Sequence, residues 1–249
     1  MPAQASRSPV VVVDAGHGWD PVHGSYTGAY NRRLRLHEDP FNLDIARRVA
    51  AALQSRGAEV YLTRDGDHLP GDFDGDGELT NGDRAHLALH LRQFFPHASG
   101  ERADAYVSIH LNASPKARVR GVTVVYSDSG AAREVVDASL GLSRLIHGHL
   151  VQLLPDSSPP FTVSGLYLDK LGVPHAVVEV GFLTNPQDVA WIQDTHNRQT
   201  AAERIARAVM EWWAHQMART GSRTDPDPPG AGFGRATSES RPSYRSPST

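Results

Sequence analysis

The distribution of apolar residues along the chain predicts strands and helices in alternation. Four consecutive valines at 10–13 are typical of a strand that is buried on both faces. The predicted strands are residues 10–13, 58–63, 103–110, 121–127 and 175–182. Apolar positions at helical spacing predict helices over residues 41–56, 83–95, 130–154 and 197–217.

This alternation predicts an α/β fold: a single domain with a mainly parallel central sheet flanked by helices. We place the domain at residues 9–220, after a short N-terminal extension of residues 1–8. Residues 221–249 contain 15 Gly, Pro or Ser out of 29 and almost no large apolar residues. Such a segment cannot bury enough surface to order itself, so we expect a disordered C-terminal tail.

Composition excludes several classes of function. The chain has 25 basic and 28 acidic residues and a formal net charge of -3, which argues against binding to nucleic acid or to an anionic membrane surface. The apolar run near the start is too short for a signal peptide or a membrane span, so we expect no export signal in this chain. Cysteine is absent, so any transition-metal site must use His, Asp or Glu.

Polar residues at the ends of three predicted strands indicate where such a site lies. His17 follows the first strand, His110 closes the third, and Glu179 lies between valines in the last. In parallel sheets ligands bind beyond the carboxyl ends of the strands, and a buried glutamate is unfavourable without a partner. A catalytic zinc usually has three protein ligands and one open position, and the two histidines supply two of the three.

The third ligand should be acidic and lie near the start of the helix that follows the first strand. Glu38 occupies that place, but His37, Asp39 and His23 are close competitors. Spacing alone does not decide among these four residues.

Two further polar residues have open roles. Asn112, two residues past His110, could orient a ligand or hold the substrate, or it could form an ordinary hydrogen bond at the strand end. His175, just before the last strand, is equally undecided.

At this point the chain resembles the zinc-dependent N-acetylmuramoyl-L-alanine amidases of the third amidase family, the cell-wall hydrolases of bacteria and their phages. The motifs that carry the resemblance are, in order, VVVDAGHGWD, EDPFNL at 38–43, GAEVYLTRD, YVSIHLNAS and VVEVGFLTN. The resemblance implies that His17, Glu38 and His110 are zinc ligands and that Glu179 is the catalytic carboxylate. The chain departs from the family pattern at Trp19, where a glycine is usual, and in the loop from His17 to Glu38, which is longer than usual.

The resemblance also implies a function, namely zinc-dependent hydrolysis of the amide bond between N-acetylmuramic acid and L-alanine in peptidoglycan. We therefore expect that the chain binds peptidoglycan and that it is a monomer. We also expect it to act in the cell envelope (periplasm or wall) or as a phage-released lysin. One alternative is another zinc peptidase that acts on the stem peptides of peptidoglycan. The other is a calcium-dependent wall-binding module without catalysis.

The segment DFDGDGELTNGD, residues 72–83, matches the twelve-residue calcium loop of EF-hands. Asp72, Asp74 and Asp76 take positions one, three and five, and Gly77 permits the sharp turn at position six. Glu78 would offer its backbone carbonyl at position seven, and Asp83 stands at twelve, where a longer glutamate is usual. We predict an inserted structural calcium site with these five acidic residues, while the chemistry of the protein lies elsewhere.

Overall fold

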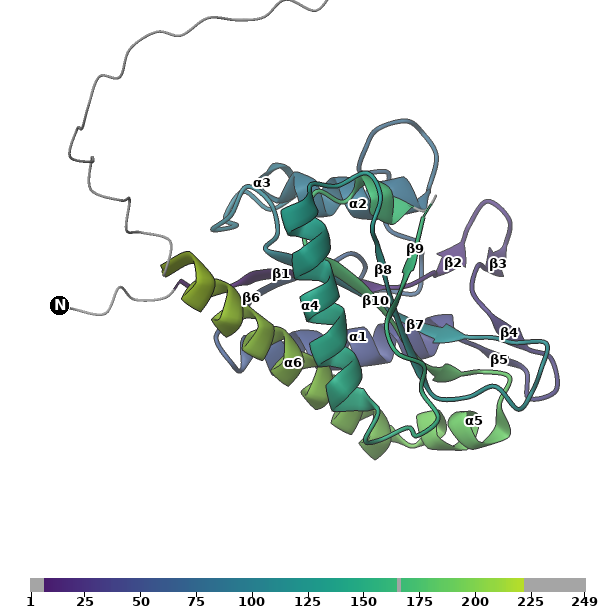
Figure 1. Ribbon diagram of the computed structural model, residues 1–249. Helices are drawn as coiled ribbons and strands as arrows, with labels where there is room; N and C mark the ends of the chain where they lie inside the picture. The colour runs from purple at the N-terminus through teal and green to yellow at the C-terminus, as the bar shows by residue number, and fades with distance from the viewer. Residues whose placement is uncertain (1–6, 165–166, 222–249) are drawn as a thin grey trace, which may run out of the picture.

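The structure is a computed structural model that describes residues 7–164 and 167–221. Its central strands are β1 (Val10–Ala15), β6 (Glu59–Leu62), β7 (Ala105–Asn112), β8 (Val122–Ser127), β9 (Phe161–Val163) and β10 (His175–Phe182). They form one six-stranded sheet in the order β6-β1-β7-β10-β8-β9 (Figure 1). Neighbouring strands are parallel except for the antiparallel pair of β8 and β10. The prediction of a single α/β domain with a mainly parallel sheet is confirmed.

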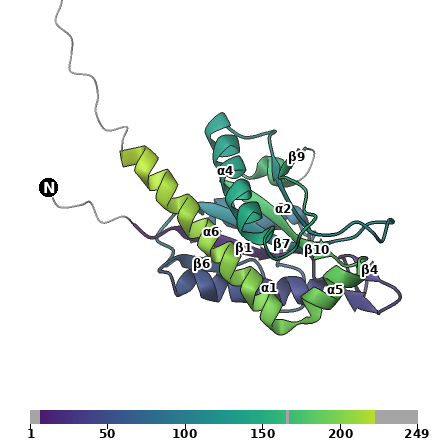
Figure 2. The same cartoon turned by 60° about the horizontal axis from the view of Figure 1, so that its bottom comes forward.

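Helices cover both faces of this sheet. On one face α1 (Asp39–Gln54), α4 (Arg133–Leu150) and α6 (Thr195–Gly221) pack together, and α6 crosses between the other two (Figure 2). The opposite face is covered by α2 (Asn81–Leu89), α3 (Leu91–Phe94) and the 3-10 helix η1 (Tyr167–Lys170).

The valine run of β1 shows why the sheet needs a helical layer on each face. Val11 and Val13 pack into the cluster with α1, α4 and α6, whereas Val10 and Val12 pack into the cluster around α2 and α3. Successive side chains of a strand point to opposite faces, so a continuous apolar run requires two apolar layers.

The long segment between His17 and Glu38 forms two small hairpins that the apolar pattern did not predict. β2 (Trp19–Asp20) pairs with β3 (Ser25–Tyr26), and β4 (Tyr30–Asn31) pairs with β5 (Leu36–His37). Strands of two residues are too short to produce an alternating pattern, which explains the omission.

Two helical predictions need correction. The helix expected over 83–95 is divided into α2 and α3 because the backbone of His90 leaves the helical region (φ −122°, ψ 41°). The apolar pattern also did not predict α5 (Pro186–Gln193), although signals for the start of this helix are present in the sequence. Asn185 accepts the N–H groups of Gln187 and Asp188, and proline follows at the first helical position.

Within the two described ranges, no helix has both the length and the apolar character needed to cross a membrane. Of the predicted disordered tail, residues 222–249 lie outside the described residues, as do residues 1–6 of the N-terminal extension. The predicted boundaries of the domain therefore stay predictions.

Candidate functional site

Three adjacent strand ends bring the predicted site residues to one edge of the sheet. β1, β7 and β10 are parallel neighbours, so their carboxyl ends lie at the same edge. His17 lies two residues beyond β1 and His110 near the end of β7. Glu179 of β10 is the direct partner of His110 in the strand register.

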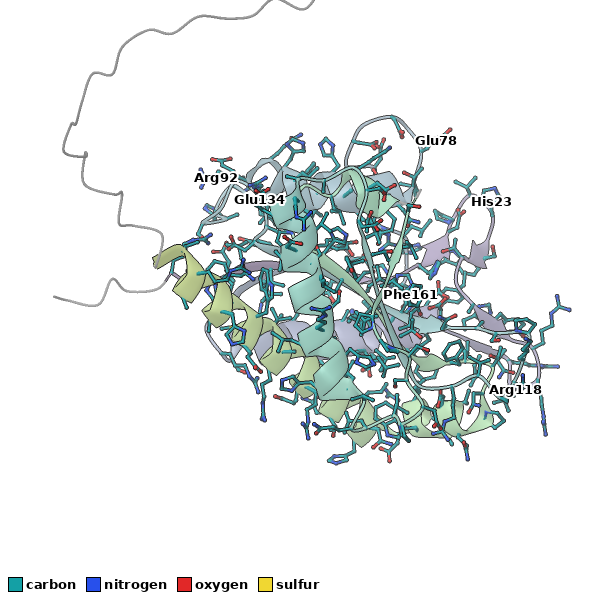
Figure 3. All side chains as sticks on the ribbon, in the orientation of Figure 1. His23, Glu78, Arg92, Arg118, Glu134 and Phe161 are labelled. Carbon is teal, nitrogen blue, oxygen red and sulfur yellow. The ribbon has the colours of Figure 1, made fainter. Side chains whose placement is uncertain are left out.

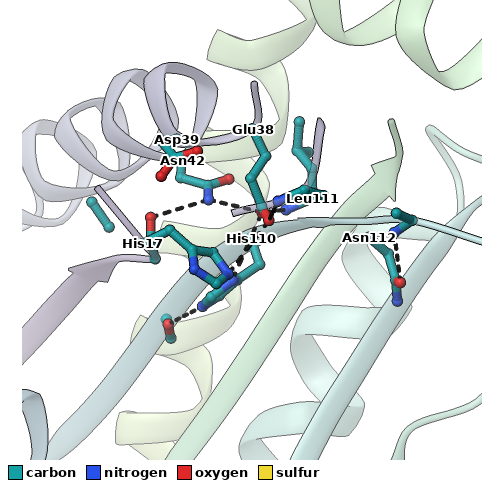
Figure 4. Close-up of polar contacts among 12 residues, drawn as sticks. His17, Glu38, Asp39, Asn42, His110, Leu111 and Asn112 are labelled. Atoms are coloured by element: carbon teal, nitrogen blue, oxygen red, sulfur yellow. Dashed lines mark hydrogen bonds and ion pairs between the residues drawn. The ribbon is translucent and has the colours of Figure 1, made fainter. Parts of the chain in front are cut away.

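His17, Glu38 and His110 form a cluster that could hold a metal ion (Figure 4). Each offers one ligand atom, and these atoms all lie within 4.8 Å of one another. Nε2 of His17 is 3.4 Å from Oε1 of Glu38, and Nδ1 of His110 is 3.8 Å from Oε2. Two imidazole nitrogens and one carboxylate are a donor set typical of catalytic zinc sites.

Glu38 is held in place by donors on both sides of its carboxylate. It immediately precedes α1 and is only 3 % exposed. Its Oε1 accepts the backbone N–H of Ala29 at 2.6 Å, while Oε2 accepts the N–H of Leu111 at 2.8 Å and the amide of Asn42 at 2.9 Å. These contacts direct the carboxylate toward the two imidazoles.

The three competitors for the third ligand position have other partners. His37 stacks on Tyr30, with ring centroids 4.3 Å apart. The carboxylate of Asp39 accepts the backbone N–H of Gly18 at 2.7 Å, and His23 lies 2.6 Å from the carboxylate of Asp20. The structure therefore groups Glu38, and not its neighbours, with the two histidines. The role of the three grouped residues as ligands stays a prediction.

In each imidazole, one ring nitrogen has a hydrogen-bond partner, and the other nitrogen, which faces Glu38, is left free. The hydroxyl of Ser108 donates its only hydrogen to the carboxylate of Asp14. Toward His110 the hydroxyl oxygen can therefore only accept, and it accepts the Nε2–H of His110 at 3.0 Å. This tautomer directs the lone pair of Nδ1 at Glu38. Burial and the nearby His17 lower the pKa of His110 to about 3, so the ring is neutral. On the other side, Nδ1 of His17 lies 3.3 Å from the hydroxyl of Thr27, which leaves Nε2 to face Glu38.

A buried ion pair supports both histidines from below. Asp14 of β1 is fully buried and accepts hydrogen bonds from Arg84, Ser108 and Thr63. Burial would raise the pKa of Asp14, but the positive charge of Arg84, the neighbouring His110 and the hydrogen bonds from Ser108 and Thr63 together outweigh it, and the pKa falls to about 2. Arg84 also donates to the backbone carbonyl of His17 at 2.8 Å.

Sequence reasoning did not identify this pair. The available signal was an aspartate directly after the four valines and a serine between apolar residues in YVSIH, both at positions where a strand is buried.

Glycines allow the elements of the cluster to approach one another. A Cβ atom at Gly16 would lie 2.3 Å from the His110 ring, and one at Gly28 would lie 2.5 Å from the Glu38 side chain. Both distances are far below van der Waals contact, so any larger residue would displace a member of the cluster.

Glu179 contributes a carboxylate with an unused oxygen. Its Oε2 is buried and has no hydrogen-bond partner within residues 7–164 and 167–221. Burial, followed by the charge of Glu38, raises the pKa of Glu179 to about 8. A divalent cation in the cluster would oppose this shift by favouring the ionised form. The site therefore places an unpartnered proton acceptor beside a candidate metal position.

The two residues with open roles differ in the structure. Oδ1 of Asn112 accepts the N–H of the next residue at 2.8 Å, and its side chain lies apart from the cluster in Figure 4. A substrate contact by Asn112 stays a prediction. His175 is fully buried, and both ring nitrogens have backbone partners, the N–H of Ser127 and the carbonyl of Val173, each at 3.0 Å. His175 is thus a satisfied core residue.

The acidic loop contains a smaller cluster than the twelve-residue pattern predicts. Asp72, Asp74 and Asp76 are exposed and offer oxygens within 4.8 Å of one another. Asp83, in contrast, is fully buried, and its oxygens accept the N–H groups of Phe73 at 2.6 Å and Thr80 at 2.7 Å.

This geometry corrects the prediction for Asp83. The residue closes a capping box with Thr80 at the start of α2, because the first N–H groups of a helix lack acceptors within the helix. A calcium contact from the backbone carbonyl of Glu78 stays a prediction.

Comparison with known proteins places this site in a family context. The sequence profile described as N-acetylmuramoyl-L-alanine amidase matches residues 11–211. The germination-specific N-acetylmuramoyl-L-alanine amidase of Bacillus subtilis is 29% identical over 209 residues, which cover 83% of this chain and 81% of that protein.

Two solved structures are similar in fold. The amidase Ami1 of Mycobacterium smegmatis matches with a TM-score of 0.69 and 22% identity, covering 84% of this chain and 99% of that one. The amidase AmiC2 of Nostoc punctiforme matches with a TM-score of 0.61 and 26% identity, with 84% and 99% of the two chains covered.

Proposed function

This chain belongs to the N-acetylmuramoyl-L-alanine amidase family, and we propose that it cleaves the muramoyl–alanine amide of peptidoglycan with a zinc ion held by His17, Glu38 and His110. The observation that carries the proposal is the cluster of these three residues beside the unpartnered carboxylate of Glu179. The profile match supports the amide bond as the target, and the cluster supports the metal.

The donor set fits zinc better than the hard cations. Imidazole nitrogens suit zinc and other transition metals, whereas calcium and magnesium prefer oxygen ligands. The free lone pairs are Nε2 of His17 and Nδ1 of His110, and both face the carboxylate of Glu38. When bound, zinc would polarise the substrate carbonyl and lower the pKa of a water to about 7.

In this proposal the chain's own groups move the proton. Glu179 accepts a proton from the attacking water as the water oxygen bonds to the lactyl carbonyl carbon. Glu179 then delivers this proton to the amide nitrogen, the carbon–nitrogen bond breaks, the lactyl group is left as a carboxylate, and the stem peptide leaves with a free amino group on its L-alanine. Ser108 and Thr27 keep the imidazoles oriented throughout, and the donors to Glu38 hold its carboxylate.

Product analysis tests this function. Digestion of purified peptidoglycan should release new amino termini that end-group labelling identifies as L-alanine. A chelator should remove the activity because it takes the zinc away from the three ligands, and added zinc should restore the activity. New amino termini from other stem-peptide residues would instead identify a stem-peptide peptidase, and full activity in chelator would contradict zinc dependence.

The substrate determines where the reaction takes place. Peptidoglycan lies outside the cytoplasmic membrane, so we propose that the enzyme acts in the periplasm or wall, or as a lysin released by a phage. This placement follows from the substrate and not from any targeting segment.

A separate prediction concerns calcium at Asp72, Asp74 and Asp76. Calcium added to zinc-loaded protein should raise its Tm, because a ligand that binds only the folded state stabilises it, by about 2.7 kcal/mol at 100 times Kd. Asp72→Asn with Asp76→Asn should abolish this rise and leave zinc content unchanged. The matched control, Asp128→Asn with Asp137→Asn, removes two acidic residues elsewhere and should respond to calcium like the parent. An equal rise in the loop variant would exclude this cluster as the site.

A further inference from the structure

Two loops near the metal cluster carry an unbalanced positive charge. Residues 30–37 read YNRRLRLH and residues 113–120 read ASPKARVR, and neither contains an acidic residue. We call these two segments the basic loops. Their exposed cations are Arg32, Arg33, Arg35, Lys116 and Arg118. In the described part of the chain, none of these five side chains has an ion pair or a hydrogen bond. The overall net charge of -3 conceals this local concentration.

Both basic loops are fastened to the same short segment, residues 183–185. The amide of Asn31 donates to the carbonyl of Leu183 at 2.7 Å. The amide of Asn185 donates to the carbonyl of Ala117 at 2.8 Å, and the N–H of Ser114 donates to the segment's threonine hydroxyl at 3.0 Å. The two loops are therefore held beside each other by contacts that do not use their charged groups.

A groove with a volume of about 460 Å³ is lined mainly by the first basic loop and by α5, and it reaches the second basic loop at one residue. Arg32, Arg33 and Leu34 line it from the first loop and Ala117 from the second, and Thr184 and Val189 also line it. Arg35 takes a left-handed backbone conformation (φ 53°), which is unfavourable for an arginine compared with glycine or asparagine. The turn thus keeps a cationic side chain at a position where another residue would be less strained.

The basic loops adjoin two of the three cluster residues. The first loop ends immediately before Glu38, and the second begins three residues after His110. Arg33 is five residues from Glu38 and Lys116 is six residues from His110, so even fully extended chain would separate these backbones by at most about 20 Å. A peptide of about five residues reaches about 17 Å, so it could extend from the cluster to the basic loops.

We propose that this groove, together with the exposed cations of the two basic loops, binds the free carboxylates of the peptidoglycan stem peptide, which extends there from the scissile bond. This inference rests on the proposed function, because that function places the start of the stem peptide at the cluster. Stem peptides carry free carboxylates from a glutamate residue and from the peptide terminus, and arginine is well suited to pair with carboxylates.

The distribution of charge favours a short anionic peptide over a long anionic polymer. The acidic loop with Asp72, Asp74 and Asp76 lies away from the basic loops, and Figure 3 shows Glu78 and Arg118 far apart on the molecule. A polyphosphate chain that ran along the whole edge would meet these acidic side chains. A stem peptide that ends at the basic loops would not.

Steady-state kinetics with matched substrates test the proposal. The substrates are N-acetylmuramoyl-pentapeptide and the same compound with its free carboxylates converted to amides. Arg33→Gln with Arg118→Gln removes one cation from each loop and should raise KM for the carboxylate substrate about tenfold, with kcat within about twofold. KM for the amidated substrate should not change. The control Arg144→Gln with Arg207→Gln removes two exposed arginines from α4 and α6 and should leave both constants at the parent values.

Binding of the free pentapeptide, measured by titration calorimetry, gives a second readout that needs no catalysis. Equal peptide affinity and equal KM in the parent and the basic-loop variant would overturn the inference, while cleavage of both substrates would uphold the proposed function. Failure of the parent to free the L-alanine amino terminus of either substrate would overturn the proposed function, and weaker peptide binding by the variant would then still support the groove. If only retention on immobilised polyphosphate fell in the variant, a phosphate polymer would be the partner and the stem-peptide proposal would be wrong.

Discussion

Glu179→Gln should reduce kcat by about 100- to 10,000-fold while the protein keeps its zinc. The substitution preserves the shape of the side chain but removes its ability to accept the proton of the attacking water. The three clustered residues, His17, Glu38 and His110, are unchanged, so metal content should equal that of the parent. Elemental analysis measures the zinc content, and the rate at which new L-alanine amino termini appear in purified wall measures the activity.

Stability measurements separate this effect from misfolding. Oε2 of Glu179 is buried without a hydrogen-bond partner, which is unfavourable for a carboxylate. The metal-free glutamine variant should therefore have a Tm equal to or above that of the metal-free parent. Glu134→Gln, in the first turn of α4, is the matched control and should change neither activity nor metal content. Near-parental activity of Glu179→Gln would rule out Glu179 as the proton acceptor.

His110→Ala should lose both zinc and activity, with the affinity for zinc falling by more than about 100-fold. Removal of a group that only orients a metal ligand already weakens binding about 10- to 100-fold, so removal of the ligand itself should do more. Ser108→Ala keeps the imidazole but removes the acceptor of its Nε2–H, and its zinc affinity should lie between those of the parent and His110→Ala. Competition with a chromophoric chelator measures all three affinities.

An exposed histidine provides the control for this series. His23 lies outside the cluster and contacts Asp20, so His23→Ala should bind zinc like the parent. If His110→Ala retained parental affinity, or if His23→Ala lost it, the assignment of the cluster as the zinc site would be wrong.

The choice of Glu38 illustrates what a linear pattern leaves open. His37, Glu38 and Asp39 are consecutive, so their distances along the chain from His17 and from His110 differ by at most two residues. Their side chains point in different directions because β5 ends and α1 begins at this place. Family resemblance favoured Glu38, and in the structure its carboxylate faces both imidazoles.

Asp83 illustrates the opposite case, in which a pattern extended too far. The twelve-residue spacing treats Asp72 and Asp83 as equivalent ligands, but the start of α2 turns Asp83 inward. A capping box and a calcium loop both place an acidic residue near a helix start, so the sequence pattern alone does not distinguish them.

The sequence by itself determined the α/β class, the order of the principal strands and helices, and the strand ends at which His17, His110 and Glu179 lie. These features follow from local periodicity and from the rule that parallel strands share a carboxyl edge. Only the tertiary structure decided which side chains meet: Asp14 with Arg84 beneath the cluster, and the two basic loops on residues 183–185. The physical reason is that these contacts join residues distant in the chain, whose directions depend on strand register and loop conformation and leave no periodic signal in the sequence.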